Sequence, residues 1–302
     1  MSKKKILIIG SSNTDMVIKA EKIPRPGETI LGGTFLMNPG GKGANQAVSA
    51  ARLDGNVTFI SKTGNDLFGD RAIELLIEEG IDARYVVKDP ELPSGVAIIT
   101  VDALGENSIA VAPGSNGNLL QSDIPSALFE TGEYGILLLQ LEIPMTVVEY
   151  SASLAINNGI KVILNPAPAR NLPDHLLKQL WLITPNETEA EILTGLSAYD
   201  SPSAEKAAYA LRQKGVKNVI ITMGSAGAYL KTENFSGMIP AVKVTPVDTT
   251  AAGDVFNGAI AVALSEGKDL REAVDFANKA ASISVTRMGA QASAPYRNEI
   301  NY

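Results

Sequence analysis

The sequence has no cysteine and one histidine among its 302 residues. Without cysteine, the protein cannot form disulfides, thiolate metal sites or a cysteine nucleophile. The one histidine, His175, lies in the segment LPDHLLKQL, which is typical of a surface helix, so serine–histidine catalysis and histidine-rich metal sites are not expected. The N-terminal segment MSKKKILIIG has too short an apolar run for a signal peptide or a membrane span, and we therefore expect a cytosolic (cytoplasmic) protein with no membrane partner.

Positively charged residues are outnumbered by negatively charged ones. There are 26 Lys and Arg against 33 Asp and Glu, which gives a net charge of −7. This balance argues against nucleic acid or an anionic membrane as a partner, so an anionic substrate would be held by local features such as helix N-termini. The composition, 45% apolar and 20% charged, is that of a globular protein with room for one large α/β domain or two modest ones.

Short apolar, β-branched runs alternate with helical patterns along most of the chain. KILIIG at residues 5–10 is typical of a buried parallel strand, and similar runs occur at VTFISKTG, GILLLQLE, KVILNPAP, LWLITPN and NVIITMG. Between most of them lie amphipathic stretches such as GANQAVSAARL, GDRAIELLIEEG and SAEKAAYALRQKG. This alternation predicts an α/β fold with a doubly wound, mainly parallel sheet flanked by helices.

Two stretches, residues 12–37 and about 94–112, interrupt the alternation because they contain strand patterns with no helix between them. In the second stretch, GVAIITV and NSIAVA flank DALGEN, which is typical of a β-hairpin. We predict that both are insertions in a single domain spanning residues 1–302 and that together they form one small antiparallel sheet. Such a sheet is marginal alone, so it is expected to cover a site, a second subunit, or both.

Polar residues follow one predicted strand after another. In open α/β sheets, ligands bind beyond the carboxyl ends of the strands, so these side chains predict a binding site there. Taken singly, each of them is equally well explained as a turn former. The residues in question are Asn13, Asp15, Glu142, Asn165, Asn186, Glu189, Thr222 and Gly224.

The segment NPGGKGANQAVSAARL, residues 38–53, is rich in glycine and leads into a helix. Its glycines would let the backbone approach a ligand closely, and Asn45 near the helix start can donate and accept hydrogen bonds; the alternative is a flexible turn. The segment is not a P-loop, because no Gly-Lys-Ser/Thr follows four spacer residues. GSSNTD after the first strand does not match a dinucleotide-binding fingerprint, so a Rossmann dehydrogenase is not expected.

The segment PVDTTAAGDVFNGAIAVAL, residues 246–264, places an acid at the start of a nearly apolar helix. Ala251, Ala252 and Gly253 keep the helix entrance free of bulky side chains, so that unpaired amides and the helix dipole can form an anion hole for a phosphoryl group. Asp254 in the first turn is then placed to act as a general base toward a substrate hydroxyl. A capping role would explain Asp254 but not the small residues before it.

In these segments, the sequence resembles the ribokinase-like carbohydrate kinase family. GGKGANQAVSAARL and VDTTAAGDVFNGAIAVAL match the two long signatures of that family, and LNPAPA, TPNETEAE and RMGAQASAP match in order and spacing, from about residue 5 to residue 298. The resemblance implies an ATP-dependent sugar kinase that uses Mg²⁺ and is activated by a monovalent cation, usually K⁺.

The resemblance also implies roles for individual residues. Asp254 would be the base that deprotonates the O5 hydroxyl of D-ribose, with Ala251, Ala252 and Gly253 as the anion hole. Positions that match ribose-binding residues are Asn13, Asp15, Gly41, Lys42, Gly43, Asn45 and Glu142. Positions that match ATP-binding residues are Asn186, Thr222, Gly224, Gly227, Gly253 and Asn278, the last standing where some relatives carry histidine near the adenine.

Two ion-binding motifs are implied in the same way. Glu189, within NETE, matches the motif that organises magnesium and phosphate and is counted with the ATP site. The positions that match a monovalent-cation site, formed largely by backbone carbonyls, are Asp248, Thr250, Ser284, Arg287, Gly289 and Ser293.

The expected activity is therefore ATP-dependent phosphorylation of D-ribose at O5, giving D-ribose 5-phosphate and ADP, in a homodimer formed through the small sheet, which in this family is also the lid. The alternatives are a kinase for deoxyribose, another pentose or a nucleoside, and a regulator that binds sugar or nucleotide without catalysis. A nucleoside needs an apolar or aromatic slot, whereas the predicted lid strands offer small or aliphatic residues such as Ala97, Ile99, Ile109 and Val111, which favours a free sugar. The intact Asp254 argues against a silent regulator.

Overall fold

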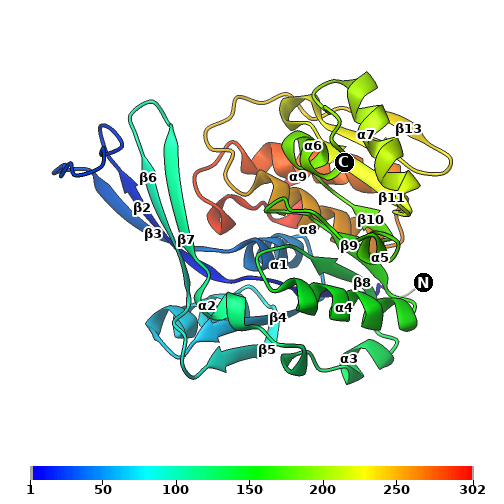
Figure 1. The fold of residues 1–302 in the computed structure, drawn as a ribbon, viewed down its shortest axis with the longest axis horizontal. Helices are drawn as coiled ribbons and strands as arrows, with labels where there is room; N and C mark the ends of the chain where they lie inside the picture. Colours follow the sequence, from blue (N-terminus) through cyan, green and yellow to red (C-terminus); the bar gives the residue numbers. More distant parts are fainter. Residues whose placement is uncertain (1–2, 301–302) are drawn as a thin grey trace.

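The computed structural model describes residues 3–300, and in this part of the chain a nine-stranded sheet and a separate four-stranded sheet are present. The four-stranded sheet projects from one side of the main body (Figure 1). From edge to edge, the large sheet runs β13 (Ser236–Ile239), β12 (Ala228–Lys231), β11 (Asn218–Thr222), β10 (Leu182–Ile183), β9 (Lys161–Leu164), β8 (Tyr134–Leu139), β1 (Lys5–Ile9), β4 (Val57–Gly64) and β5 (Asp82–Asp89).

The pairs from β5 to β11 are all parallel, and β12 and β13 add an antiparallel hairpin at one edge. The α/β fold with a mainly parallel sheet is thus confirmed. Along β1, alternate side chains enter different cores, Ile6 and Ile8 on one face and Leu7 and Ile9 on the other. Both faces are apolar because both are covered by helices, as parallel sheets require.

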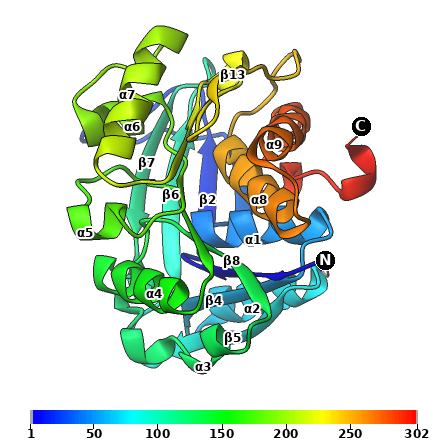
Figure 2. The same cartoon turned by 90° about the vertical axis from the view of Figure 1, so that its right-hand side faces the viewer.

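Helices cover the two faces as separate layers, which Figure 2 shows on either side of the strands. One layer contains α1 (Lys42–Arg52), α2 (Leu67–Glu78), α8 (Ala252–Ser265) and α9 (Leu270–Ser284). The other contains α3 (Ala127–Glu130), α4 (Met145–Asn157), α5 (Asp174–Leu177), α6 (Glu187–Thr194) and α7 (Ser201–Gln213). Short 3₁₀ turns lie at η1 (Gly114–Asn118), η2 (Gln121–Asp123), η3 (Gly224–Ala226), η4 (Gln291–Ser293) and η5 (Arg297–Glu299).

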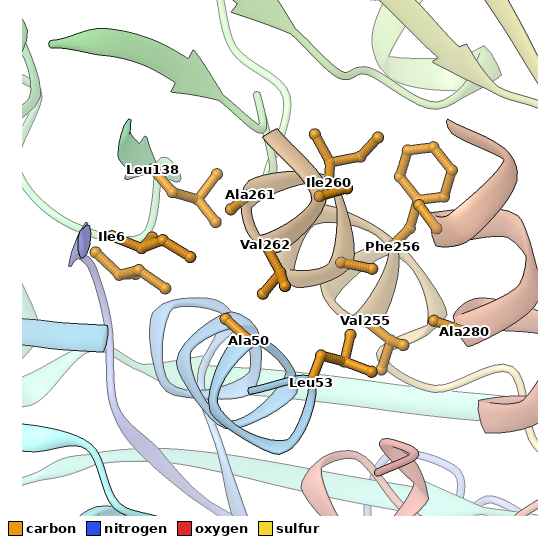
Figure 3. Packing of buried hydrophobic residues seen from close by; sticks show 14 of the residues in the cluster. Ile6, Ala50, Leu53, Leu138, Val255, Phe256, Ile260, Ala261, Val262 and Ala280 are labelled. Atoms are coloured by element: carbon orange, nitrogen blue, oxygen red, sulfur yellow. The ribbon is translucent and has the colours of Figure 1, made fainter. Parts of the chain in front are cut away.

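Helix α8 is buried on all sides. Every residue from Asp254 to Ser265 is buried, because the helix packs between the sheet, α1 and α9 (Figure 3). Leu53, directly after α1, and Ala280 of α9 contribute to the same core as Ile260 of α8. A helix that is apolar on all sides is a core helix. Its burial brings the first turns of α1 and α8 together at the carboxyl edge of the sheet.

The small sheet is formed by both predicted insertions, with strand order β3 (Thr34–Gly40), β2 (Asn13–Lys19), β6 (Gly95–Val101) and β7 (Asn107–Ala112). Each hairpin is antiparallel, as predicted. The two hairpins are joined by the pair β2–β6, which is parallel, a feature the sequence did not indicate. Parallel pairing arises because both strands leave the large sheet at its carboxyl edge and run outward in the same direction.

The sequence patterns missed some elements. Strand β5 and the edge hairpin of β12 and β13 were not predicted, and the run at residues 180–186 forms a strand only at Leu182–Ile183. His175 lies in the short helix α5 with an exposed side chain beside Glu149, as expected for a surface residue. No helix within residues 3–300 has the length and apolar character needed to cross a membrane.

Candidate active site

Asp254 lies in the first turn of α8, with only 5% of its surface exposed. Its Oδ2 accepts a hydrogen bond from Asn45 Nδ2 at 3.0 Å, and its Oδ1 accepts one from Gln46 Nε2 at 3.0 Å. Burial raises the pKa of Asp254, and the charge of Lys42 and the two amide donors oppose that rise. A carboxylate with a raised pKa is a stronger proton acceptor, which is the property required of a general base.

Four carboxylates surround Lys42 at the start of α1. Burial lowers the pKa of Lys42, but the negative charges of Asp254, Glu142, Glu189 and Asp15 outweigh it, so the net shift is upward and the ammonium group stays charged. Burial, with the charges of Glu142 and Asp254, raises the pKa of Asp15 to about 6. Such a cluster of perturbed groups is typical of a functional site.

The glycines of the GGKG segment allow α1 to begin in close contact with the ends of β1 and β2. Gly41 has φ +87°, and a Cβ there would lie 2.7 Å from the backbone nitrogen of Asn13. A Cβ at Gly43 would lie 2.6 Å from the carbonyl carbon of Gly10. The segment is therefore a tightly packed helix start and not a flexible turn, and its packing fixes Lys42 in the carboxylate cluster.

Two further residues hold the polar side chains of this region in place. Ser11 Oγ donates to Glu142 Oε2, and the backbone nitrogen of Lys42 donates to the same oxygen at 3.0 Å. Asn116 of η1 donates through Nδ2 to Asn13 Oδ1 at 2.7 Å. Ser11 and Asn116 were not predicted from the sequence, although Ser11 directly follows a predicted strand, a position that could have indicated it.

The N-terminus of α8 is open, but only in part as predicted. No described residue accepts a hydrogen bond from the backbone N–H of Ala251, Gly253 or Asp254, whereas the Ala252 N–H donates to the carbonyl of Thr249 at 3.3 Å. The expectation that Ala252 offers a free amide is therefore wrong for this conformation. Ala251 has a left-handed backbone, with φ 59°. Strained backbone of this kind is common at functional sites.

Gly253 faces open space. A Cβ added there would meet no atom of residues 3–300 within 4 Å, so no contact with this part of the chain requires glycine at this position. A glycine in a helix costs about 0.5–1 kcal/mol relative to alanine. We infer that the glycine at position 253 leaves space for a bound ligand.

Two adjoining cavities meet at this helix start. The smaller, of ≈ 190 Å³, lies beside Lys42, Glu189 and Asp254. The larger, of ≈ 650 Å³, extends toward α9 and has apolar walls that include Val242, Val244, Phe256, Ala281 and Val285. Residues 241–246 of this wall were not predicted, because they belong to no helix or strand. Both cavities are lined by Asn186, Thr222, Thr249, Ala252 and Gly253.

The predicted ATP-binding residues meet at these cavities. Gly224, Gly227 and Asn278 line the larger one, where Asn278 Nδ2 donates to the carbonyls of Ile239 at 3.0 Å and Pro240 at 3.1 Å. Asn186 and Glu189 form a reciprocal cap at the start of α6. Asn186 Oδ1 accepts from the backbone N–H of Glu189 at 2.8 Å, and Glu189 Oε2 accepts from the backbone N–H of Asn186 at 2.9 Å. The cap places both side chains at the cavity wall.

A family model described as pfkB family carbohydrate kinase matches residues 3–297. The protein belongs to the pfkB family of carbohydrate kinases. The kinase is 44% identical to a ribokinase from Haemophilus influenzae over 297 residues, which cover 98% of this chain and 97% of that relative. It is 39% identical to a deoxyribokinase from Salmonella typhi over 297 residues, with the same coverage of each chain.

The fold comparison agrees with the sequence comparison. A solved structure of Arabidopsis thaliana ribokinase complexed with ribose and ATP superimposes with a TM-score of 0.92 at 32% identity, covering 99% of this kinase and 98% of that chain. The predicted family and enzyme class are thereby confirmed.

The predicted monovalent-cation residues of the kinase lie in two segments that are joined to each other, one before α8 and one that runs from the end of α9 to η4. Asp248 Oδ1 accepts from the Thr250 amide and Oδ2 from the Gly289 amide, both at 2.9 Å. The Val247 amide donates to the carbonyl of Val285 at 2.7 Å. The hydroxyls of Ser284 and Ser293 bond to carbonyls of their own segments, and the Arg287 guanidinium pairs with Glu299.

These contacts limit how the two segments could bind a cation. Each Asp248 oxygen accepts a hydrogen bond from one backbone amide and keeps a second lone pair, so a cation there could take the carboxylate as a ligand together with backbone carbonyls. Among residues 3–300, no group of three or more His, Cys, Asp or Glu side chains is arranged to hold a metal ion. A site of carbonyls suits a hard monovalent cation better than a transition metal.

Proposed function

We propose that this kinase phosphorylates D-ribose at O5 with ATP, giving D-ribose 5-phosphate and ADP. The observation that carries the proposal is the position of Asp254, a buried carboxylate between the polar cluster around Lys42 and the open helix terminus at Gly253. A hydroxyl held in the cluster would lie beside a base on one side and a phosphate-binding helix start on the other.

The polar cluster supplies the groups that bind a small polyol. Asp15 and Glu142 can accept hydrogen bonds from hydroxyls, and Lys42, Asn13 and Asn45 can donate them. Register places Ala97 opposite Asp15, and Val111 opposite Ala97, so these three residues share one face of the small sheet. Small and aliphatic side chains on that face suit a lid over a free sugar. They provide no aromatic surface for a nucleobase.

The reaction uses Asp254 and the start of α8 at the same time. Asp254 would take the O5 proton as O5 forms a bond to the γ-phosphorus of ATP, and the bond from that phosphorus to the ADP oxygen would break. The free amides of Gly253 and Asp254, with the helix dipole, would stabilise negative charge on the transferring group. The apolar walls of the larger cavity suit the adenine ring, which Asn278 would face.

Magnesium and potassium are proposed as the ions of the site. Magnesium in kinases is commonly held by one or two carboxylates together with substrate phosphates, and the Glu189 carboxylate at the smaller cavity suits that role. It would neutralise charge on the ATP phosphates. The joined loops of Asp248 and Gly289 would hold the potassium ion next to the start of α8.

We also propose a homodimer formed through the small sheet. Register places Ile18 opposite Phe35, and Met16 opposite both Met37 and Ile98, on the face away from Asp15. Phe35 is 59% exposed, Met37 55% and Ile98 47%. Contiguous exposed apolar residues of this kind mark interaction surfaces, and a second copy of the sheet would cover them.

The deciding experiment is an assay coupled to ADP release with D-ribose, 2-deoxy-D-ribose, other pentoses and a nucleoside. D-ribose should give the highest kcat/KM, and 5-deoxy-D-ribose, which lacks the accepting hydroxyl, should give no turnover. A missing hydroxyl that leaves a buried partner unpaired costs about 1–3 kcal/mol, roughly five- to 150-fold in kcat/KM. A higher kcat/KM for 2-deoxy-D-ribose would instead make the enzyme a deoxyribokinase, like its relative from Salmonella typhi.

A further inference from the structure

A chain of buried amide side chains leads to Asp254. Gln46 Nε2 donates to Asp254 Oδ1 at 3.0 Å and to Asn165 Oδ1 at 3.1 Å. Gln46 Oε1 in turn accepts from Gln140 Nε2 at 2.5 Å. Gln46 and Gln140 are both fully buried. Neither residue was predicted from the sequence as part of the site.

These contacts fix which way the Gln46 amide points. With the amide reversed, its oxygen would face two acceptor oxygens and its nitrogen would face the donor of Gln140. The observed orientation therefore presents a donor to Asp254. This series of hydrogen bonds holds Oδ1 of Asp254, while the hydrogen bond from Asn45 holds Oδ2.

Gln140 is a costly residue for a core position. Its Oε1 is buried and has no hydrogen-bond partner in the described part of the chain, and it lies where a Cβ on Gly10 would be only 2.0 Å away. An unpartnered buried polar atom costs about 1–3 kcal/mol, and an apolar side chain of similar shape would avoid that cost. Among residues 3–300, its hydrogen bond to Gln46 is the one interaction in which the amide is used, so its contribution is to orientation.

A second branch of the network reaches the anion-hole side of the same helix turn. Asn165 Nδ2 donates to the carbonyl of Thr184 at 3.2 Å, and Thr184 Oγ1 donates to Asn257 Oδ1 at 2.6 Å. Asn257 Nδ2 then donates to the Gly253 carbonyl at 2.8 Å. Gln140, Asn165 and Thr184 directly follow the adjacent strands β8, β9 and β10, so the network runs along the edge of the sheet.

We propose that Gln46 is a positioning residue, held by Gln140, that orients the Asp254 carboxylate, while the branch through Asn165, Thr184 and Asn257 holds Gly253 at a fixed distance from it. This inference rests on the proposed role of Asp254 as base. Misplacing a reacting group by about 1 Å costs about a hundredfold in rate. Removing the Gln46 amide should therefore affect kcat more than substrate binding.

The pH dependence provides a readout that a purely structural role would not change. Burial raises the pKa of Asp254, and the Gln46 donor opposes that rise. Without the donor, the acid limb of the kcat profile should move to higher pH. The other charged groups around Asp254 are Lys42, Glu142, Asp15 and Glu189, and all of them stay in place in the variant.

The test compares Gln46→Met with Gln179→Met. Gln179 is the control for removing a glutamine amide away from the site: like Gln140, it donates one amide hydrogen bond, to Ser153 Oγ at 3.1 Å, and its buried Oε1 has no partner among residues 3–300, but it lies just after α5. In Gln46→Met, kcat should fall about ten- to a hundredfold, the ribose KM should stay within a few-fold, and the acid limb should shift upward. In Gln179→Met, kcat and the pH profile should be unchanged. A folded Gln46→Met enzyme with unchanged kcat and pH profile would overturn the proposal.

Gln140→Met provides a second, independent test, because Gln140 is hydrogen-bonded to Gln46 and not to Asp254. It should lower kcat, though less than Gln46→Met, and it should cause no further loss in the Gln46→Met background, since its effect passes through Gln46. Additive losses would contradict the proposal. If Gln46→Met proves too unstable to purify, an unchanged kcat in Gln140→Met refutes it alone. Normal turnover in Asp254→Asn would refute the base itself, whereas an inactive Asp254→Asn beside a normal Gln46→Met would refute only the positioning role.

Discussion

Replacing Asp254 by asparagine removes the proposed base with almost no change in shape. The carboxylate accepts from Asn45 Nδ2 and Gln46 Nε2, and the new amide can keep its oxygen toward Gln46. Its NH₂ group would then face Asn45, whose Oδ1 is buried and accepts no hydrogen bond from any residue between 3 and 300. A flip of the Asn45 amide presents that oxygen to the new donor, so both hydrogen bonds survive.

The structural cost of Asp254→Asn should therefore be small. One rearranged hydrogen bond is worth about 1 kcal/mol, and losing a buried charge offsets part of it. The catalytic cost should be much larger, because an amide cannot take the O5 proton. General bases contribute about 10²–10⁴-fold, which corresponds to roughly 3–5 kcal/mol in the barrier.

The assay measures kcat, the KM for ribose and for ATP, and the thermal midpoint of the purified variant. We expect kcat to fall by about 10²–10⁴, the ribose KM to change little because Asp15, Lys42 and Glu142 remain, and the ATP KM to stay the same. The thermal midpoint should move by a few degrees at most. A variant with near-normal kcat would refute the base assignment and leave Asp254 with a structural role through its hydrogen bonds to Asn45 and Gln46, since the N-cap of α8 is Ala251 and Asp254 caps no amide within residues 3–300.

Three further outcomes are expected. Gly253→Ala should keep or raise the thermal midpoint, because alanine favours a helix over glycine by about 0.5–1 kcal/mol. The same variant should lower kcat/KM for ATP, because its methyl group projects into the space left for phosphate; unimpaired ATP kinetics would contradict a phosphate site there. The pKa of Asp15 is raised to about 6 in the folded protein. The contribution of Asp15 to stability is therefore fully present at a pH below the pKa of the unfolded chain, and it is lost as the pH rises through about 6. Asp15→Asn should therefore stabilise the protein at pH 7.5 but not near pH 4, with a raised ribose KM, and equal melting of both proteins at pH 7.5 would refute the shift. Potassium should activate at fixed magnesium and sodium only weakly, and full activity in potassium-free buffer would exclude a functional cation at the Asp248 loops.

Local patterns were sufficient to predict much of this enzyme. The alternation of apolar runs and amphipathic stretches predicted the sheet and its covering helices, because strand and helix periods are properties of neighbouring residues. The small residues before Asp254 predicted an open helix start, which depends only on the chain within one turn. Polar residues after the strands predicted an edge where ligands bind, since the carboxyl ends of parallel strands share one edge.

Other features depended on residues far apart in the chain. Gln46 and Asp254 are separated by 208 positions, and their hydrogen bond exists because α1 and α8 pack side by side. Asn116 reaches Asn13 through the turn η1, and the cavity wall at residues 241–246 has no periodic pattern to reveal it. The same is true of the parallel pairing of β2 and β6, which no local turn signal encodes.

The sequence by itself determined the fold class, the chemical type of the site and the identity of its proposed base, because each rests on spacing within a few residues. Only the tertiary structure decided that Gln46 and Gln140 stand behind that base, that the Ala252 amide is already bonded, and that Gly253 faces empty space. Those facts follow from how buried helices and strand ends pack against one another. Hydrogen-bond partners over such distances are selected by three-dimensional geometry, which leaves no periodic trace in the chain.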